Sequence, residues 1–169
     1  MTYFIWLLRI IHIGAGVFWV GGALMMAFFI KPTIDATGDA GRKFLEYLMN
    51  TKKISARISA AAGSSVLAGA ILYWIDSQGL TSAWMKSGAG TGFTIGAVFA
   101  LLGFAFGILV GRANKSMVQL STQMQGKPSP EQLSQMQSMQ KRQGTFTTLS
   151  NIGLILAVVF MAIARYFQF

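Results

Sequence analysis

Four long apolar runs constrain the fold of this sequence more than any other feature. A helix needs about 20 apolar residues to cross the hydrocarbon core of a bilayer, and each run approaches or exceeds that length. Charged residues make up only 11% of the 169-residue chain, whereas a soluble domain carries about 25%. The pattern predicts one all-α domain, an integral membrane four-helix up-down bundle. Its predicted spans are residues 4–30, 56–75, 92–110 and 146–164.

The basic residues are distributed unevenly, and this asymmetry predicts the orientation of the bundle. Eleven of the fourteen Lys and Arg lie in or beside the connections at residues 31–55 and 111–145. Because cytoplasmic loops concentrate Lys and Arg, we expect both termini outside and a multi-pass location in the cell inner (cytoplasmic) membrane. Few aromatic residues are interleaved with these cations, so we expect no nucleic-acid partner. The eleven are Lys31, Arg42, Lys43, Lys52, Lys53, Arg57, Arg112, Lys115, Lys127, Lys141 and Arg142.

The first connection contains an amphipathic pattern of its own. Asp39 is placed to cap a helix whose apolar face carries Phe44, Leu45, Leu48 and Met49. Cations flank this face, which is typical of a helix that lies on anionic lipid.

The second connection is expected to contain a separate helix. Ser129 is a good N-cap, Pro130 suits the first helical position, and Gly144 is expected to end the helix. Met136 and Met139 are spaced as soft copper(I) ligands, but an apolar stripe is the interpretation we favour.

Small residues recur along the third and second runs. In the third, a ridge at about four-residue spacing allows close helix packing, either within the monomer or in a homodimer or larger complex through Gly103, Gly107 and Gly111. Small and polar residues in the second and fourth runs are expected to support contacts between helices in a structural role. They are Ser59, Ser64, Ser65, Gly69, Ser150 and Asn151. The whole ridge comprises Gly92, Gly96, Ala100, Gly103, Gly107 and Gly111.

The only histidine lies inside the first apolar run, in LRIIHIGAGVFWVGG. Polar residues within a span are functional candidates by default, and His12 follows Arg9 by three residues. Gly16, one turn further along, is expected to leave space beside the imidazole for a large flat ligand. Trp19 shares that face and is expected to pack along the ligand.

The fourth run repeats this arrangement from the opposite direction. Met161 is expected at a depth similar to that of His12, with Arg165 one turn nearer the outer surface. Imidazole and thioether form an axial pair for haem iron, and two arginines suit the propionates. The spacing therefore suggests haem b between the first and fourth helices. Alternatively, Met161 fills the core, Arg165 anchors the interface and His12 bonds to a serine or a carbonyl group.

The first run also resembles known families. LRIIHIGAGVFWVGGALMM, with His12 followed by Trp19, Gly21 and Gly22, is similar to the opening helix of the CopD-type copper-resistance membrane proteins. It also resembles that of the HemJ-type protoporphyrinogen oxidases, which are small four-helix proteins. The second resemblance implies b-haem ligation by the first-helix histidine, with a methionine on another helix as its partner.

These observations predict a membrane b-type haem protein for electron transfer or haem-linked oxidoreduction. As an enzyme it would be an oxidoreductase of the haem, tetrapyrrole or respiratory type. Two alternatives stay open. One is a copper path through His12, Met25 and Met26, and the other is a cofactor-free structural subunit of a larger membrane complex.

Overall fold

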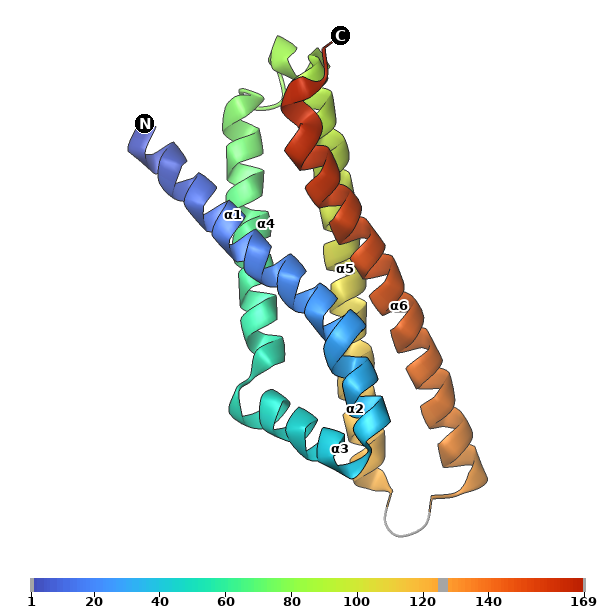
Figure 1. The fold of residues 1–169 in the computed structure, drawn as a ribbon. Helices are drawn as coiled ribbons and strands as arrows, with labels where there is room; N and C mark the ends of the chain where they lie inside the picture. The colour runs from blue at the N-terminus through green and yellow to red at the C-terminus, as the bar shows by residue number, and fades with distance from the viewer. Residues whose placement is uncertain (1, 125–127, 169) are drawn as a thin grey trace.

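Every regular element of the described chain is a helix. The computed structural model describes residues 2–124 and 128–168, and Figure 1 shows their arrangement. Four helical stretches are long and apolar enough to cross a membrane, which confirms the all-α prediction and indicates a multi-pass membrane protein. They are Thr2–Thr37, Ile54–Asp76, Gly88–Gln123 and Pro130–Tyr166.

The first stretch is longer than predicted. Helix α1 (Thr2–Met25) continues through a π-helical turn, η1 (Met26–Ile30), into α2 (Lys31–Thr37). Because Gly38 adopts a left-handed φ of 55°, the chain turns there, a conformation that glycine takes without steric cost.

Helix α3 (Asp39–Glu46) follows this turn and leads into η2 (Tyr47–Thr51). The predicted cap is wrong: Gly38 occupies the N-cap position without a side-chain hydrogen bond. Asp39 is instead the first helical residue, where its charge suits the helix dipole, and its carboxylate lies 3.4 Å from the Arg42 guanidinium. In the predicted apolar face, Phe44 is exposed and Leu45 is partly buried.

Helix α4 (Ile54–Asp76) is joined through η3 (Ala83–Lys86) to the long helix α5 (Gly88–Gln123). At about 1.5 Å per residue, the 36 residues of α5 extend roughly 54 Å, well beyond a hydrocarbon core of about 30 Å. Its partner α6 (Pro130–Ile163) ends in η4 (Ala164–Tyr166). Much of the predicted connection at 111–145 is therefore a continuation of these two helices.

The start of α6 was predicted correctly and its end was not. Ser129 Oγ accepts a hydrogen bond from the Gln132 backbone, and the Gln132 side chain accepts one from the Ser129 N–H, which forms a capping box. Gly144 does not end the helix: α6 continues through it from Pro130 to Ile163, and a single glycine within a helix costs only about 1 kcal/mol. Met136 and Met139 are partly buried, as in an apolar stripe.

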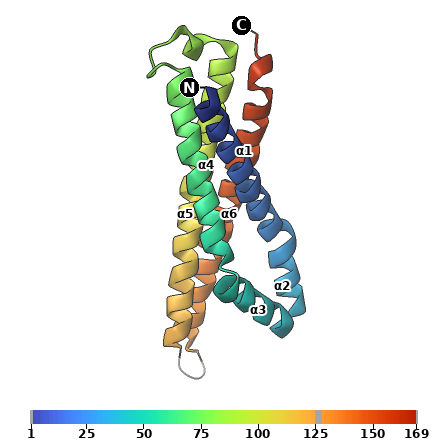
Figure 2. The same ribbon diagram turned by 90° about the vertical axis from the view of Figure 1, so that its left-hand side faces the viewer.

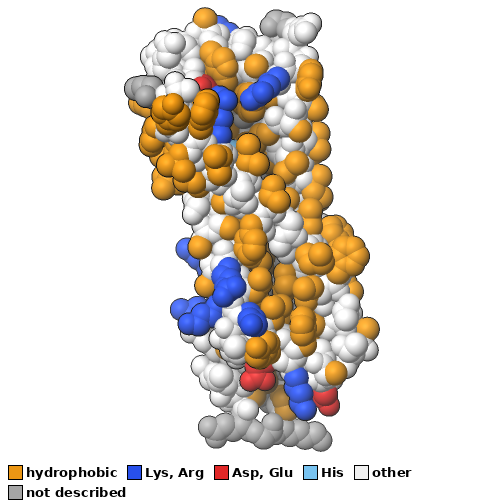
Figure 3. Space-filling model, turned by 60° about the vertical axis from the view of Figure 1, so that its left-hand side comes forward, with side chains coloured by type: hydrophobic (Ala, Val, Ile, Leu, Met, Phe, Trp, Pro, Cys, Tyr) orange, Lys and Arg blue, Asp and Glu red, His pale blue; other side chains and the backbone are white. Residues whose placement is uncertain are grey.

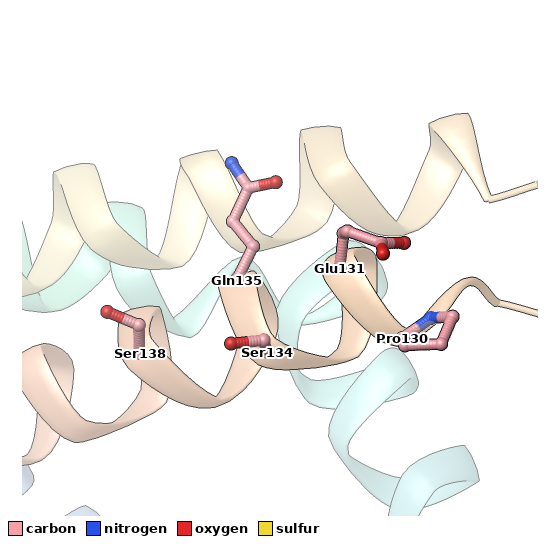
Figure 4. Close-up of a pocket in the computed structure, with 5 residues that line it drawn as sticks. All are labelled: Pro130, Glu131, Ser134, Gln135 and Ser138. Carbon is pink, nitrogen blue, oxygen red and sulfur yellow. The ribbon is translucent and has the colours of Figure 1, made fainter.

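The outer side of the same turns carries a shallow polar hollow. Figure 4 shows that all its labelled side chains come from the first turns of α6. Hydrogen bonds from its own backbone N–H and from the Ser129 hydroxyl lower the pKa of the Glu131 carboxyl below its usual value. The lining residues are Pro130, Glu131, Ser134, Gln135 and Ser138.

The glycine ridge of α5 packs against α6 within the monomer. A Cβ atom at Gly103 would lie 3.0 Å from the Leu154 side chain, and Ser150 Oγ donates a 2.8 Å hydrogen bond to the Gly103 carbonyl. Gly107 has a looser contact with Ser150, and a Cβ atom at Gly111 would meet no described atom within 4 Å. The sequence left open whether the ridge packs within the monomer or against another chain. Gly103 packs within the monomer, while Gly111 remains accessible to a partner.

The other helix pair is α1 and α4, and one small core joins it to α6. Trp19, Ala62 and Leu154 form this core, and the Trp19 ring meets Phe104 edge-on at 5.8 Å. Figures 1 and 2 show α1 crossing α4 and its N-terminal end diverging from the C-terminal end of α6. The α2–α3 corner, the C-terminal end of α5 and the start of α6 lie at one end of the molecule, and the N-terminal end of α1 and the C-terminal end of α6 lie toward the other (Figure 1).

Candidate functional site

The imidazole of His12 links α1 to α4. Its Nδ1 atom lies 2.8 Å from the backbone carbonyl oxygen of Ser65. Because a carbonyl oxygen can only accept, Nδ1 carries the proton and donates it, and this tautomer of the imidazole has its free lone pair on Nε2. In return, Ser65 Oγ donates a 2.9 Å hydrogen bond to the His12 carbonyl. The structure therefore contains the serine and carbonyl contact that the sequence offered as an alternative to a ligand.

Two glycines allow this close crossing. A Cβ atom at Gly69 would lie 2.7 Å from His12 Cε1, and one at Gly16 would lie 3.1 Å from Ser65 Oγ. The imidazole thus lies against the bare backbone of α4. The space that the sequence assigned to a flat ligand at Gly16 is filled by the Ser65 hydroxyl, because α4 packs there.

The second ring nitrogen of His12 remains available. Nε2 has no hydrogen-bond partner among the residues that the structure describes. Every fully buried side-chain nitrogen or oxygen in the same part of the chain has a partner, so Nε2 is open to its surroundings. A proton held at Nδ1 and an open Nε2 is the arrangement found in histidines that bind metals.

The proposed second ligand has a different neighbour. Met161 is partly buried on α6, and a Cβ atom at Gly96 of α5 would lie 2.7 Å from Met161 Cγ. His12 of α1 thus packs on α4 and Met161 of α6 packs on α5. The N-terminal end of α1 and the C-terminal end of α6 diverge (Figure 1). No hydrogen bond in the described chain joins the two predicted axial ligands.

The remaining predicted site residues divide into exposed and buried ones. Arg9 and Arg165 are exposed and form no ion pair with any described residue, so both guanidinium groups are free to bind a carboxylate. Trp19 is only 7% exposed and packs with Phe104, which makes it a core residue. Within residues 2–124 and 128–168, no three His, Asp or Glu side chains are grouped as metal ligands.

Sequence reasoning named Ser65 and Gly69 only among the small and polar residues of the second helix and did not connect them with His12. A serine and a glycine four residues apart indicate one small helix face, yet its partner helix could not be identified from spacing. No protein-family model, curated protein or solved structure matches this chain. The likeness of the first helix to the CopD and HemJ types therefore stays a prediction.

Proposed function

We propose that this protein binds a b-type haem in the membrane through His12 Nε2 and takes part in electron transfer or haem-linked oxidoreduction. One observation carries the proposal: the Nδ1 proton is held by the Ser65 carbonyl while Nε2 is open. Such an outer hydrogen bond fixes the ring orientation and makes the imidazole a stronger ligand. The chain has no other histidine and no cysteine to take this role.

Two exposed arginines would hold the propionates of a haem bound at His12. Arg9, one turn from His12 on α1, has no acidic partner in the described chain and would bind a propionate. Arg165 would bind the other. The Met161 side chain packs against Gly96 and would have to move away from it to bind the iron. A separate variant therefore tests Met161 as a ligand. Bound there, the haem iron would supply one-electron transfer.

The proposed orientation places both termini outside in an up-down bundle of the cytoplasmic membrane. Its support is that residues 31–57 and 111–142, which hold eleven of the fourteen Lys and Arg, include the α2–α3 corner, the C-terminal end of α5 and the start of α6, and these lie at one end of the molecule (Figure 1). Lys127, one of the eleven, lies outside the described residues. Figure 3 shows Lys and Arg gathered in the lower part of one face, with a smaller group near the top. Under the positive-inside rule the lower end faces the cytoplasm.

A cofactor-free structural role is the second candidate, because the His12–Ser65 hydrogen bonds also serve as a structural link between helices. An absorption spectrum of the detergent-purified protein, reduced minus oxidised, separates the two. We expect a Soret band and a reduced α-band from the wild type, and their loss in His12→Ala. A colourless wild type after expression with ample haem, or an unchanged spectrum in His12→Ala, would contradict the haem proposal.

Met161→Leu is the matched variant for the second ligand, since it keeps volume and apolarity. If Met161 binds the iron, the haem remains bound but changes its spin state and its reduction potential falls. An unchanged spectrum and potential would assign the second axial position to water or to a neighbouring chain.

A further inference from the structure

A groove lies between the first helical stretch and α6, away from His12. Its volume is about 290 Å³. One wall comes from η1 and the start of α2, and the other from the middle of α6. A π-helical turn such as η1 is rare and is often found at functional sites. The lining residues are Ala27, Phe28, Lys31, Gln143, Gly144, Thr147, Thr148, Asn151, Ile152 and Ile155.

Asn151 presents an unpaired amide to this groove. The residue is only 6% exposed, yet its side chain makes no hydrogen bond with any residue that the structure describes. No fully buried polar atom in that part of the chain lacks a partner, so the free amide atoms open into the groove. An unpaired amide in an apolar environment costs several kcal/mol, and a ligand with an ester or phosphate oxygen would satisfy it. The neighbouring Ser150, by contrast, donates to Gly103.

Polar and apolar groups are ordered along the groove. Lys31 lies on the helical stretch that leads to the basic corner and pairs with Asp35 at 2.7 Å while remaining exposed. On α6, the lining changes from Gln143 to the apolar Ile152 and Ile155 over about 18 Å at the helical rise. The lining includes one lysine and no carboxylate. The groove is therefore amphipathic and favours an anion at its polar end.

We propose that this groove binds one anionic phospholipid. Lys31 and Gln143 hold the phosphate, the Asn151 amide donates to an ester oxygen, and the acyl chains lie along Ile152, Ile155 and Phe28. Basic pockets between transmembrane helices on the cytoplasmic side recognise anionic headgroups in this way. The proposal concerns a defined site and does not depend on haem.

Native mass spectrometry of the full-length protein in detergent tests the site. Phosphatidylglycerol and phosphatidylcholine with identical acyl chains compete for the protein in equal amounts. We expect one phosphatidylglycerol to be retained preferentially, and Lys31→Gln to weaken it about fivefold, the effect of about 1 kcal/mol per basic residue. Asn151→Leu weakens both lipids because it removes the amide and keeps a similar volume.

Gly144→Leu fills the groove directly. A Cβ atom at Gly144 meets no described atom within 4 Å, so the substitution adds bulk without a clash, and Gly111→Leu on α5 is the matched control for the same reason. We expect Gly144→Leu to abolish retention and Gly111→Leu to leave it unchanged. If Gly144→Leu fails to fold, the loss of lipid retention in Asn151→Leu tests whether the phospholipid binds in this groove.

Three results would overturn the assignment. Retention of phosphatidylglycerol by folded Gly144→Leu and Asn151→Leu would show that the lipid binds elsewhere. The Lys52 cation does not line the groove. If Lys52→Gln weakened phosphatidylglycerol retention as much as Lys31→Gln does, the lipid would be held by diffuse attraction to the basic surface. Displacement of the phospholipid by an equal amount of a neutral quinone would show that the groove does not select an anion.

Discussion

Replacing Gly69 by alanine tests the crossing of α1 and α4 that orients His12. The new Cβ atom would lie 2.7 Å from His12 Cε1 and 2.8 Å from Nδ1, whereas carbon atoms in good contact lie about 3.5–4.0 Å apart. The imidazole must therefore move by about 1 Å. We expect a shift of this size to break its 2.8 Å hydrogen bond to the Ser65 carbonyl.

The expected loss of stability combines three effects. Interhelical hydrogen bonds in membranes contribute about 0.6 kcal/mol, with about 1.7 as the upper value. Overpacking costs about 1–3 kcal/mol, and the higher helix propensity of alanine returns up to about 1 kcal/mol. We therefore expect Gly69→Ala to lower the free energy of unfolding by about 1–2 kcal/mol.

Gly63→Ala is the matched control on the same helix, because a Cβ atom there meets no described atom within 4 Å. Unfolding of both variants by SDS titration, followed by circular dichroism, measures the difference. Because His12 is the only histidine, ¹⁵N labelling of histidine also gives one pair of ring signals, and we expect Nδ1 to be protonated in the wild type. Equal stability of the two variants, or a wild-type proton on Nε2, would refute the described crossing.

Three further predictions concern packing and orientation. Gly103→Leu places bulk against Leu154 and should destabilise the α5–α6 pair by about 3 kcal/mol, whereas Gly111→Leu should unfold in SDS as the wild type does. Ser150→Ala removes the hydrogen bond to the Gly103 carbonyl and should lower the free energy of unfolding by about 1 kcal/mol; no change would show that this bond contributes nothing. A reporter fused after residue 169 should be active only if it functions outside the cytoplasm, and activity of a cytoplasm-only reporter would reverse the proposed orientation.

The sequence was sufficient to predict the elements whose cause is local. The four apolar runs imply four long helices because each is long enough to cross the bilayer as a helix, which satisfies its own backbone hydrogen bonds within lipid. The start of α6 also followed from local chemistry, since Ser129 suits the N-cap and Pro130 the first helical position; Gln132, which the prediction did not name, completes the capping box. Helix ends were less predictable. Gly144 lies within α6, because one glycine costs a helix too little to end it. Gly38, with its positive φ, occupies the N-cap position that was predicted for Asp39.

The contacts of the candidate site could not be predicted from the sequence, because residue spacing does not tell which helices pack beside each other. Depth along the membrane follows from counting residues, and it suggested His12 and Met161 as a pair. Lateral position depends on which helix packs beside which, and the structure places His12 on Gly69 and Met161 on Gly96. The same uncertainty explains why the prediction of open space beside Gly16 was wrong: the Ser65 hydroxyl of α4 occupies that space.

The most direct test of the central claim is the magnetic coupling between the haem iron and a labelled histidine. Protein expressed with ¹⁵N-histidine and unlabelled porphyrin is purified, oxidised and measured by electron–nuclear double resonance. Because each chain carries one histidine, the account predicts ¹⁵N coupling from His12 at an axial position of the ferric haem. A haem-containing sample without any ¹⁵N coupling would show that His12 does not bind the iron.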